Sequence, residues 1–382
     1  MMSTFAGRLA LQQRVLPIYR VAFFDSLAQA CQGGLSVFAG KPLPDEGIAM
    51  ASGLQVAQWM EARNWHFSNP QSSYYLCWQT GILGWLNQWR PDALIVEANP
   101  RYLSTPLAIR WMRARGKPVL GWGLGVGRVS GLLAGLRENG RRRFIQQFDG
   151  IIAYSRRGAE AYQQLGFPAE RIFVAPNAMM PKPQHPPPPR PEKVEGKLNV
   201  LFVGRLQSRK RIDHLLLACA QLPEGLQPNI WIVGDGPARA EFENLARLVY
   251  PRAEFTGARF GRDLEAFYMA ADLFVLPGTG GLAVQQAMSY ALPVIVAQGD
   301  GTQEDLVTPQ NGWQVPEDDV EALRVVLHAA LSDVPRLRRM GSESYRLVCE
   351  KANIEVMREV FLEALLSAEA LLQHSKSVPM GG

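Results

Sequence analysis

The residues best suited to chemistry lie in one basic run, Val203-Gly204-Arg205-Leu206-Gln207-Ser208-Arg209-Lys210-Arg211. The run follows a short apolar stretch that predicts a buried strand, and it precedes apolar residues at helical spacing. Gly204 lets a ligand approach the backbone closely, Arg205 offers a bidentate fork for a phosphate, and Lys210 adds a compact positive charge. With a helix N-terminus behind them, these residues predict a diphosphate site. A solvent-exposed basic turn is the alternative that the charges alone leave open.

Two glycine-rich turns further along the chain occupy equivalent positions. Gly234 and Gly236 follow one predicted strand, and Gly280, Gly281 and Leu282 follow another. Glycine permits the positive φ and the close approach that such turns need, and consecutive amides can hold an anion or sugar hydroxyls. Each turn taken singly is equally well a structural turn. Because all three follow strands of one predicted sheet, we expect them to converge on one pocket.

Alternating strands and helices must position these turns. From residue 198 onward, short apolar runs alternate with longer helical patterns, which is typical of a doubly wound parallel sheet. The N-terminal half repeats the pattern less regularly, with helices expected at 23–32, 79–88, 105–115 and 158–165. The predicted fold class is therefore α/β, with two Rossmann-like doubly wound domains facing each other across a cleft. Such a cleft is the default ligand site.

A proline-rich segment divides the chain almost in half. Residues 181–191 read PKPQHPPPPRP, and proline fixes φ and removes backbone donors, so this stretch should be extended and semi-rigid. We interpret residues 1–180 as an N-terminal domain, 181–196 as a linker, 197–355 as a C-terminal domain and 356–382 as a terminal segment with a long amphipathic helix. A long surface loop within one domain is the alternative for the proline-rich segment.

Composition and charge limit the class of protein. The chain has 382 residues, 47% of them hydrophobic, which is enough apolar material for two cores. Its net charge is +5, yet 19 basic and only 10 acidic residues lie within residues 1–180. This basic half suggests an anionic partner, with a solvated basic face as the alternative. Four scattered cysteines without C-x-x-C spacing fit a reducing compartment and no disulfide framework.

The sequence shows no apolar run long enough for a signal peptide or for a membrane span of about 20 residues. We therefore expect a cytoplasmic protein. The basic segments 105–117 and 137–145 also contain Trp, Phe and Leu, a composition found in interfacial segments. They predict peripheral attachment to the inner face of an anionic membrane, and surface helices with solvated arginines are the alternative.

Several other chemistries lack their motifs in this chain. No D-x-D occurs to bridge a donor through a metal, and the five histidines show no ligand spacing. Neither a G-x-G-x-x-G after the first strand nor a G-x-x-x-x-G-K-[ST] is present, which disfavours dinucleotide oxidoreduction and ATP hydrolysis by a phosphate loop. No G-x-S-x-G elbow occurs either. We expect no metal, no cofactor and no nucleic-acid partner.

The motifs together resemble the C-terminal half of the family 4 retaining glycosyltransferases, also described as the group 1 type. The matching segments keep the family's order and spacing over about residues 198–330; they include Gly204-Arg205-Leu206, Gly234-Asp235-Gly236-Pro237, Phe255-Thr256-Gly257, Ala271-Asp272-Leu273-Phe274-Val275-Leu276-Pro277, and Ala287-Met288. The resemblance implies a GT-B fold whose last helix crosses back to the N-terminal domain. It also implies that Arg205 and Lys210 bind the donor diphosphate, and that Thr256 and Gly257 belong to the nucleotide-sugar site.

The chain departs from the family at two functional positions. Relatives carry two glutamates eight residues apart, where this chain has Gly278 and Gln286. Gln286 can still hydrogen-bond a ribose, although a neutral partner binds more weakly than a charged one. The amides of Gly280, Gly281 and Leu282 would then contact the donor sugar.

The N-terminal half resembles a subset of the same family more loosely. In this half many relatives carry a histidine at the position of Leu124, so no catalytic histidine is assigned. Tyr19 and Arg20, in the first loop, are the candidates for the acceptor side. Packing at the start of the first helix is the alternative for both.

The function implied is transfer of a sugar from a nucleotide-diphosphate sugar to a hydroxyl of a glycan or lipid-linked acceptor. The reaction would be retaining and metal-independent, and it would serve synthesis of polysaccharide, cell-surface glycan or glycolipid. Arg205 and Lys210 would stabilise the charge that grows on the departing diphosphate. A non-catalytic nucleotide- or glycan-binding protein of the same fold is the alternative. A sugar-nucleotide epimerase is disfavoured because few acid–base candidates are present.

Overall fold

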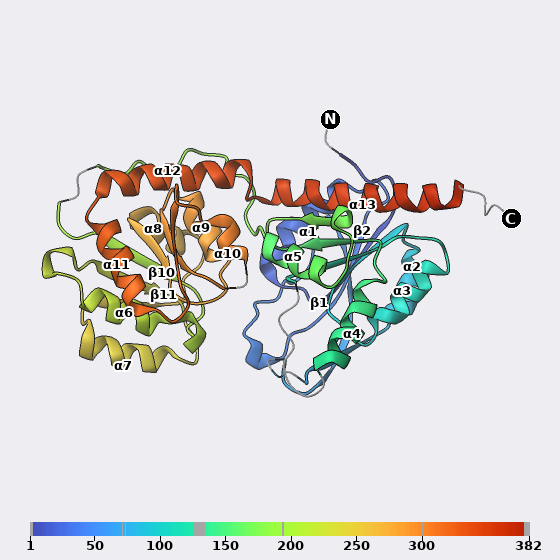
Figure 1. The fold of residues 1–382 in the computed structure, drawn as a ribbon, viewed down its shortest axis with the longest axis horizontal. Coiled ribbons are helices and arrows are strands. Elements are labelled where there is room, and N and C mark those ends of the chain that lie inside the picture. Colours follow the sequence, from blue (N-terminus) through green and yellow to red (C-terminus); the bar gives the residue numbers. More distant parts are fainter. Residues whose placement is uncertain are drawn as a thin grey trace. The chain divides into compact units, whose positions relative to one another are not determined.

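The computed structural model describes residues 3–70, 72, 74–125, 134–192, 195–299 and 301–377. The chain divides into two compact units: residues 1–181 together with 354–382 form the first, and residues 182–353 form the second. Each unit is a parallel sheet flanked by helices (Figure 1). Both units are therefore Rossmann-like, as the strand–helix alternation predicts.

The first unit contains a seven-stranded sheet in the order β3-β2-β1-β6-β7-β8-β9, in which every neighbouring pair is parallel. The order reverses between β1 and β6, because the chain first builds outward on one side of β1 and then returns to its other side. The strands are β1 (Leu9–Val15), β2 (Leu35–Gly40), β3 (Gln58–Glu61), β6 (Ala93–Glu97), β7 (Val119–Gly123), β8 (Gly150–Ala153) and β9 (Ile172–Val174).

Helices cover both faces of this first sheet, and strand alternation divides its core in two. Leu9 and Leu11 of β1 pack with α1 and α13 on one face, whereas Ala10 packs with α2 and α3 on the other. The aromatic rings of Phe23, Trp122 and Phe361 pack against one another where α13 contacts the sheet. The helices are α1 (Val21–Gln29), α2 (Ile82–Trp89), α3 (Thr105–Arg113), α4 (Ala134–Ile145), α5 (Arg156–Gln164) and α13 (Ile354–Ser377), with short 3₁₀ turns at Ile18–Arg20, Pro44–Glu46 and Ala169–Arg171.

A two-stranded antiparallel hairpin stands apart from this sheet. It pairs β4 (Arg63–Phe67) with β5 (Leu76–Thr80). The sequence pattern predicts a helix from residue 79, but residues 76–80 form β5 and the helix α2 begins only at Ile82. The prediction is wrong there because Cys77 and Gln79 are buried while Trp78 and Thr80 are exposed, a period of two that belongs to a strand.

The second unit has a six-stranded parallel sheet in the order β12-β11-β10-β13-β14-β15. Its order reverses between β10 and β13. The strands are β10 (Asn199–Val203), β11 (Asn229–Val233), β12 (Ala253–Gly257), β13 (Leu273–Leu276), β14 (Val294–Ala297) and β15 (Gly312–Val315); the helices are α6 (Ile212–Ala220), α7 (Arg239–Val249), α8 (Gly261–Ala270), α9 (Ala283–Ser289), α10 (Thr302–Leu306), α11 (Val320–Leu331) and α12 (Val334–Glu350), with 3₁₀ turns at Ser208–Lys210 and Glu224–Leu226.

The proline-rich segment has contacts of its own within the second unit. The Arg190 guanidinium donates hydrogen bonds to the backbone carbonyls of Ala271, Tyr268 and Tyr290. Arg338, which pairs with Asp272 at 2.7 Å, also donates to the carbonyl of Pro191 at 2.9 Å. The proline-rich segment is thus held against the second unit by hydrogen bonds at Arg190 and Pro191.

The ends of β10, β11 and β12 approach one another so closely that glycine is required. The amide of Gly204 donates to the Val233 carbonyl, and the amide of Gly234 donates to the Gly257 carbonyl. Gly234 has a φ of 148°, and a Cβ there would lie 1.9 Å from the Gly204 carbonyl oxygen. No side chain fits at this position without moving the backbone.

We expect Gly234→Ala to lower the free energy of unfolding of the second unit by about 1–3 kcal/mol, because overpacked sites must shift their backbone. Gly225→Ala is the matched control, since a Cβ at Gly225 meets nothing within 4 Å. Thermal and urea unfolding of both variants measure the difference. Equal stability of the two variants would contradict the close approach.

Candidate functional site

The first candidate site lies where the order of the second sheet reverses. The loop after β10 and the loop after β13 leave neighbouring strands at their carboxyl ends, which is the usual ligand position in such sheets. Lys210 is only 6% exposed, and its ammonium donates to the carbonyls of Thr279, at 2.9 Å, and of Gly280. The Thr279 amide donates back to the Arg209 carbonyl at 3.1 Å. The structure therefore brings Lys210 to the turn at Gly280.

Two further arginines share this region. Arg205 is partly buried and lies two residues after the end of β10. Arg209, which the sequence interpretation did not select, donates from Nη1 to the Thr279 carbonyl at 3.1 Å while its side chain stays exposed. Its place in the same basic run was the available signal. Arg211 instead forms an ion pair with Asp318 at 2.8 Å, so a carboxylate of the protein balances its charge.

The glycines predicted to contact the donor have backbone-packing roles. A Cβ at Gly236 would lie 2.3 Å from the Leu206 carbonyl oxygen, next to the close contact of Gly234 with Gly204. The Leu206 amide in turn donates to the Asp235 carbonyl at 2.9 Å. On the neighbouring strand, the Thr256 hydroxyl donates to the Gly257 carbonyl at 3.2 Å. These contacts hold the carboxyl ends of β10, β11 and β12 next to one another.

The backbone leaves no room for a side chain at position 278. A Cβ on Gly278 would lie 2.2 Å from the Arg209 carbonyl oxygen and 2.6 Å from the Lys210 carbonyl carbon. Gly281 is also restricted, because a Cβ there would meet Leu276 at 2.6 Å. Gln286 lies in α9, one turn into the helix that follows Leu282, and is partly buried. Of the family's two carboxylate positions, only 286 has room for one.

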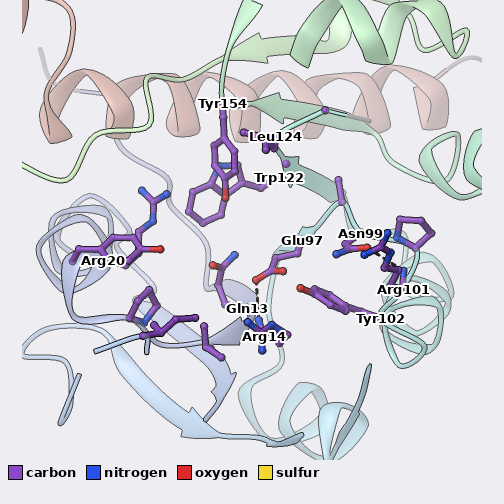
Figure 2. Close-up of a pocket in the computed structure, with 18 of the residues that line it drawn as sticks. Gln13, Arg14, Arg20, Glu97, Asn99, Arg101, Tyr102, Trp122, Leu124 and Tyr154 are labelled. Atoms are coloured by element: carbon purple, nitrogen blue, oxygen red, sulfur yellow. Dashed lines mark hydrogen bonds between the residues drawn. The ribbon is translucent and has the colours of Figure 1, made fainter. Parts of the chain in front are cut away.

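The second candidate site is a cavity of about 430 Å³ within the first unit (Figure 2). It opens beyond the carboxyl ends of β1, β6, β7 and β8. Tyr19 and Arg20 both line it, as does Leu124. Sequence reasoning missed most of the lining, which includes Gln13, Arg14, Glu97, Asn99, Arg101, Tyr102, Trp122, Arg141 and Tyr154.

Arg20 is held rigidly at one side of the cavity. Its side chain is 4% exposed, and its guanidinium lies 5.0 Å from the Trp122 ring centroid and 5.8 Å from that of Tyr154. The guanidinium also donates to the Asn177 side chain and, at 3.3 Å, to the Ala178 carbonyl. Arg20 thus lines the cavity and also packs within the first unit, which are the two roles that the sequence left open for it.

Glu97 is the carboxylate among the residues that line the cavity. Its Oε1 accepts the Arg14 amide at 2.8 Å, and Figure 2 shows it between Gln13 and Tyr102. Burial raises the pKa of Glu97, although the Arg14 amide, the Tyr102 hydroxyl and the charges of Arg14 and Arg20 favour its ionised form. The Arg14 guanidinium itself is paired with Glu46 at 2.6 Å.

The described residues hold no group of three or more His, Cys, Asp or Glu side chains placed to bind a metal ion. None of the helices in the described part of the chain is both long and apolar enough to span a bilayer.

Two family profiles match the two halves of the chain. The profile described as "Glycosyl transferases group 1" matches residues 188–347, and "Glycosyl transferase 4-like domain" matches residues 28–178. Among solved structures, sucrose-phosphate synthase from Thermosynechococcus elongatus superposes with a TM-score of 0.69 at 19% identity, over 97% of this chain and 100% of that one. Anabaena HepE in complex with UDP gives 0.69 at 16% identity, over 94% and 99%. The fold and its strand order define a GT-B protein.

The chain belongs to the group 1 glycosyltransferases. A GDP-mannose-dependent alpha-mannosyltransferase of Mycolicibacterium smegmatis is 34% identical over 184 residues, which are 46% of this chain and 46% of that protein. The lipopolysaccharide core biosynthesis glycosyltransferase LpsE of Rhizobium meliloti is 23% identical over 324 residues, 76% of this chain and 90% of that protein. The matches to the first three curated relatives span between 26% and 46% of their lengths.

Introducing the family's carboxylates separately tests the Gly278 contact. We expect Gly278→Glu to destabilise the second unit by roughly 1–3 kcal/mol, because its Cβ would overlap the Arg209 carbonyl. Gln286→Glu should unfold within about 0.5 kcal/mol of the unmodified protein, since its Cβ is already accommodated. Thermal unfolding compares the two, and a stable Gly278→Glu protein would show that this loop can move.

The raised pKa of Glu97 predicts a pH-dependent effect on stability. The folded state holds this proton more tightly than the unfolded chain, so ionisation destabilises the fold as pH rises through the folded-state pKa. We expect Glu97→Gln to match the unmodified protein near pH 4 and to melt at a higher temperature near pH 8. Glu160→Gln, an exposed change in the same unit, is the control. A difference that does not grow with pH contradicts the assignment.

Proposed function

We propose that the chain transfers a sugar from a nucleotide-diphosphate sugar to a hydroxyl of a glycan or lipid-linked acceptor. The observation that carries the proposal is the position of Lys210 and Arg209 on the Thr279–Gly280 turn, at the reversal point of the second sheet. Relatives support the donor class, because HepE has been solved with UDP and with UDP-glucose and the mycobacterial relative is named as GDP-mannose-dependent.

The chemical step needs stabilisation of the leaving group. When the bond between the sugar and the diphosphate breaks, negative charge grows on the diphosphate oxygens. Fixed cations stabilise that charge where it develops, with little reorganisation during the reaction. Lys210 is held in place by two carbonyls and Arg205 lies in the same loop, so we propose that these two residues make a metal ion unnecessary. Retention of configuration is part of the same proposal.

The acceptor class follows from the relatives' names and from the basic first unit. LpsE is named for lipopolysaccharide core biosynthesis, and a 28% identical relative of Escherichia coli is named a putative colanic acid biosynthesis glycosyltransferase. We therefore propose an acceptor in cell-surface glycan synthesis.

Replacing the two cations tests the donor site. We expect Arg205→Ala and Lys210→Ala each to reduce sugar transfer by at least about 100-fold, which corresponds to losing one charge-stabilising contact in the transition state. Transfer is measured against a panel of UDP- and GDP-sugars with glycan acceptors. Arg262→Ala, an exposed change on α8, should leave transfer unchanged.

Calorimetry on the same variants measures their binding of UDP and GDP. Together with the transfer assay, it distinguishes an active transferase from a non-catalytic binder. A protein that binds nucleotide but transfers no sugar across the panel is the non-catalytic binder. Unchanged transfer in folded Arg205→Ala and Lys210→Ala proteins would remove both residues from the mechanism.

We also propose that the first unit attaches to an anionic membrane, through the outer face of the β4–β5 hairpin. Trp65 and Trp78 pair across the two strands and are 47% and 37% exposed, beside Phe67 at 52%. Arg63 lies 4.4 Å over the Trp65 ring, and residues 62–91 include no Asp or Glu. Aromatic side chains with neighbouring cations suit a lipid headgroup region.

The segments that the sequence suggested for this role are less suitable. Ala108, Ile109 and Met112 of α3 and Phe144 and Ile145 of α4 are buried in the first unit.

Vesicle sedimentation tests the hairpin face. We expect binding to phosphatidylglycerol vesicles at low salt, weakened by added salt, and at least about five-fold lower binding for the Trp65→Ser/Trp78→Ser double variant. Phe260→Ser, which removes an aromatic 78% exposed in the second unit, is the control. Equal binding of the double variant and the control, or no sedimentation at all, contradicts the proposal.

A further inference from the structure

The cavity of the first unit is lined by four arginines and the single carboxylate of Glu97. Two of the arginines are already committed: Arg14 forms a bidentate pair with Glu46, and Arg20 is enclosed by aromatic rings. Arg101 lies on the opposite side of the cavity from Arg20 (Figure 2), and Arg141 also lines the cavity. The Arg101 side of the cavity therefore carries excess positive charge.

Arg101 has no ion-pair partner among the residues that the structure describes. Within the described part of the chain its guanidinium makes no hydrogen bond or ion pair, although its backbone amide is fixed by the Asn99 side chain at 3.1 Å. Its charge acts instead on a second cation, because burial and then the charge of Arg101 lower the pKa of Arg141. Two guanidinium groups near one another in a partly buried space repel each other, and a bound anion would relieve that repulsion.

Buried hydrogen-bond donors in the same cavity also lack acceptors. Gln13 is 6% exposed and Trp122 is 1% exposed, and both line the cavity. In the described structure neither the Gln13 Nε2 nor the Trp122 Nε1 has a hydrogen-bond partner. Buried donors are normally satisfied, so exceptions of this kind need an explanation. Both nitrogen atoms are closed off from solvent in the described structure, so they belong to the packed wall behind the cavity surface.

The remaining walls suit a sugar ring. Tyr19, Tyr102, Trp122 and Tyr154 line the cavity, and Trp122 packs edge-on against Tyr154 with centroids 5.2 Å apart. Aromatic faces pack well against the C–H groups of a pyranose, while Glu97 and Asn99 offer oxygens to its hydroxyls. The volume of about 430 Å³ lies within the usual range for small-molecule sites.

We propose that this cavity binds an acceptor sugar that carries a carboxylate or a phosphate, and that Arg101 binds the anionic group. That the ligand is the acceptor rests on the proposed function. The binding chemistry rests only on the Arg101 guanidinium, which has no partner among the described residues, and on the aromatic walls of the cavity. A guanidinium binds either anion bidentately, so carboxylate and phosphate share this chemistry.

Binding of three probes to the full chain tests the proposal in the absence of any donor. D-glucuronate carries the carboxylate, glucose 6-phosphate carries the phosphate, and D-glucose is the neutral match. Ligand-observed NMR titrations give each Kd. We expect at least one charged probe to bind ten-fold or more tightly than glucose, and the tighter of the two identifies the anion.

Matched variants place that preference in the cavity. Arg101→Gln should abolish it, whereas Arg101→Lys should retain part of it, because a point charge keeps the attraction without the bidentate geometry. Arg110→Gln, an exposed change on α3, should leave all three affinities unchanged. Thermal unfolding confirms that each variant is folded.

Three outcomes overturn the inference: no probe binds, all three probes bind equally, or the charged probe keeps its advantage in Arg101→Gln. UDP and GDP are also titrated into the same samples. Their binding shows whether a negative result concerns the acceptor cavity alone or the proposed function as well. Nucleotide binding with no Arg101-dependent preference overturns only the acceptor inference. An Arg101-dependent preference without nucleotide binding or sugar transfer overturns only the donor function.

Discussion

The second unit depends on the close approach of two loops at the reversal point of its sheet. The Lys210 ammonium is bound by the carbonyls of Thr279 and Gly280, and the Thr279 amide returns a bond to Arg209. This contact is possible only because Gly278 carries no Cβ. A buried lysine must satisfy its hydrogen bonds, and here the same carbonyls that satisfy it also fix its charge at the turn. One steric constraint thus sets both the packing and the electrostatics of the proposed donor site.

The same constraint clarifies the missing family carboxylates. The backbone of residues 209 and 210 occupies the space beside Gly278, so this chain has no room for a side chain there. The charge balance of the turn shifts accordingly, because Lys210 and Arg209 meet carbonyl oxygens there instead of a carboxylate. A more positive turn still suits a diphosphate, so the departure alters how the sugar would be held more than how the leaving group would be stabilised.

In the second unit, contacts with backbone groups shape the site, whereas side chains form the cavity of the first unit. Strand ends and the segments that follow them contribute cations, aromatic rings and Glu97, and Arg14 is held by its partly buried ion pair with Glu46. Sequence reasoning found only Tyr19 and Arg20 there, because the other lining residues are single positions spread from Gln13 to Tyr154 with no shared motif. Their proximity arises only when parallel strands place their carboxyl ends together.

The sequence by itself determined the α/β class, the two doubly wound sheets and the basic loop with Arg205 and Lys210, because strand–helix periodicity and short glycine motifs are local properties. It misassigned residues 79–80, where strand and helix preferences compete over a short apolar stretch. Only the tertiary structure decided that Arg209 reaches the Thr279 turn and that Gly278 excludes a side chain. The physical reason is that these contacts join segments about 70 residues apart in the chain. A local sequence pattern does not show which distant segments will meet.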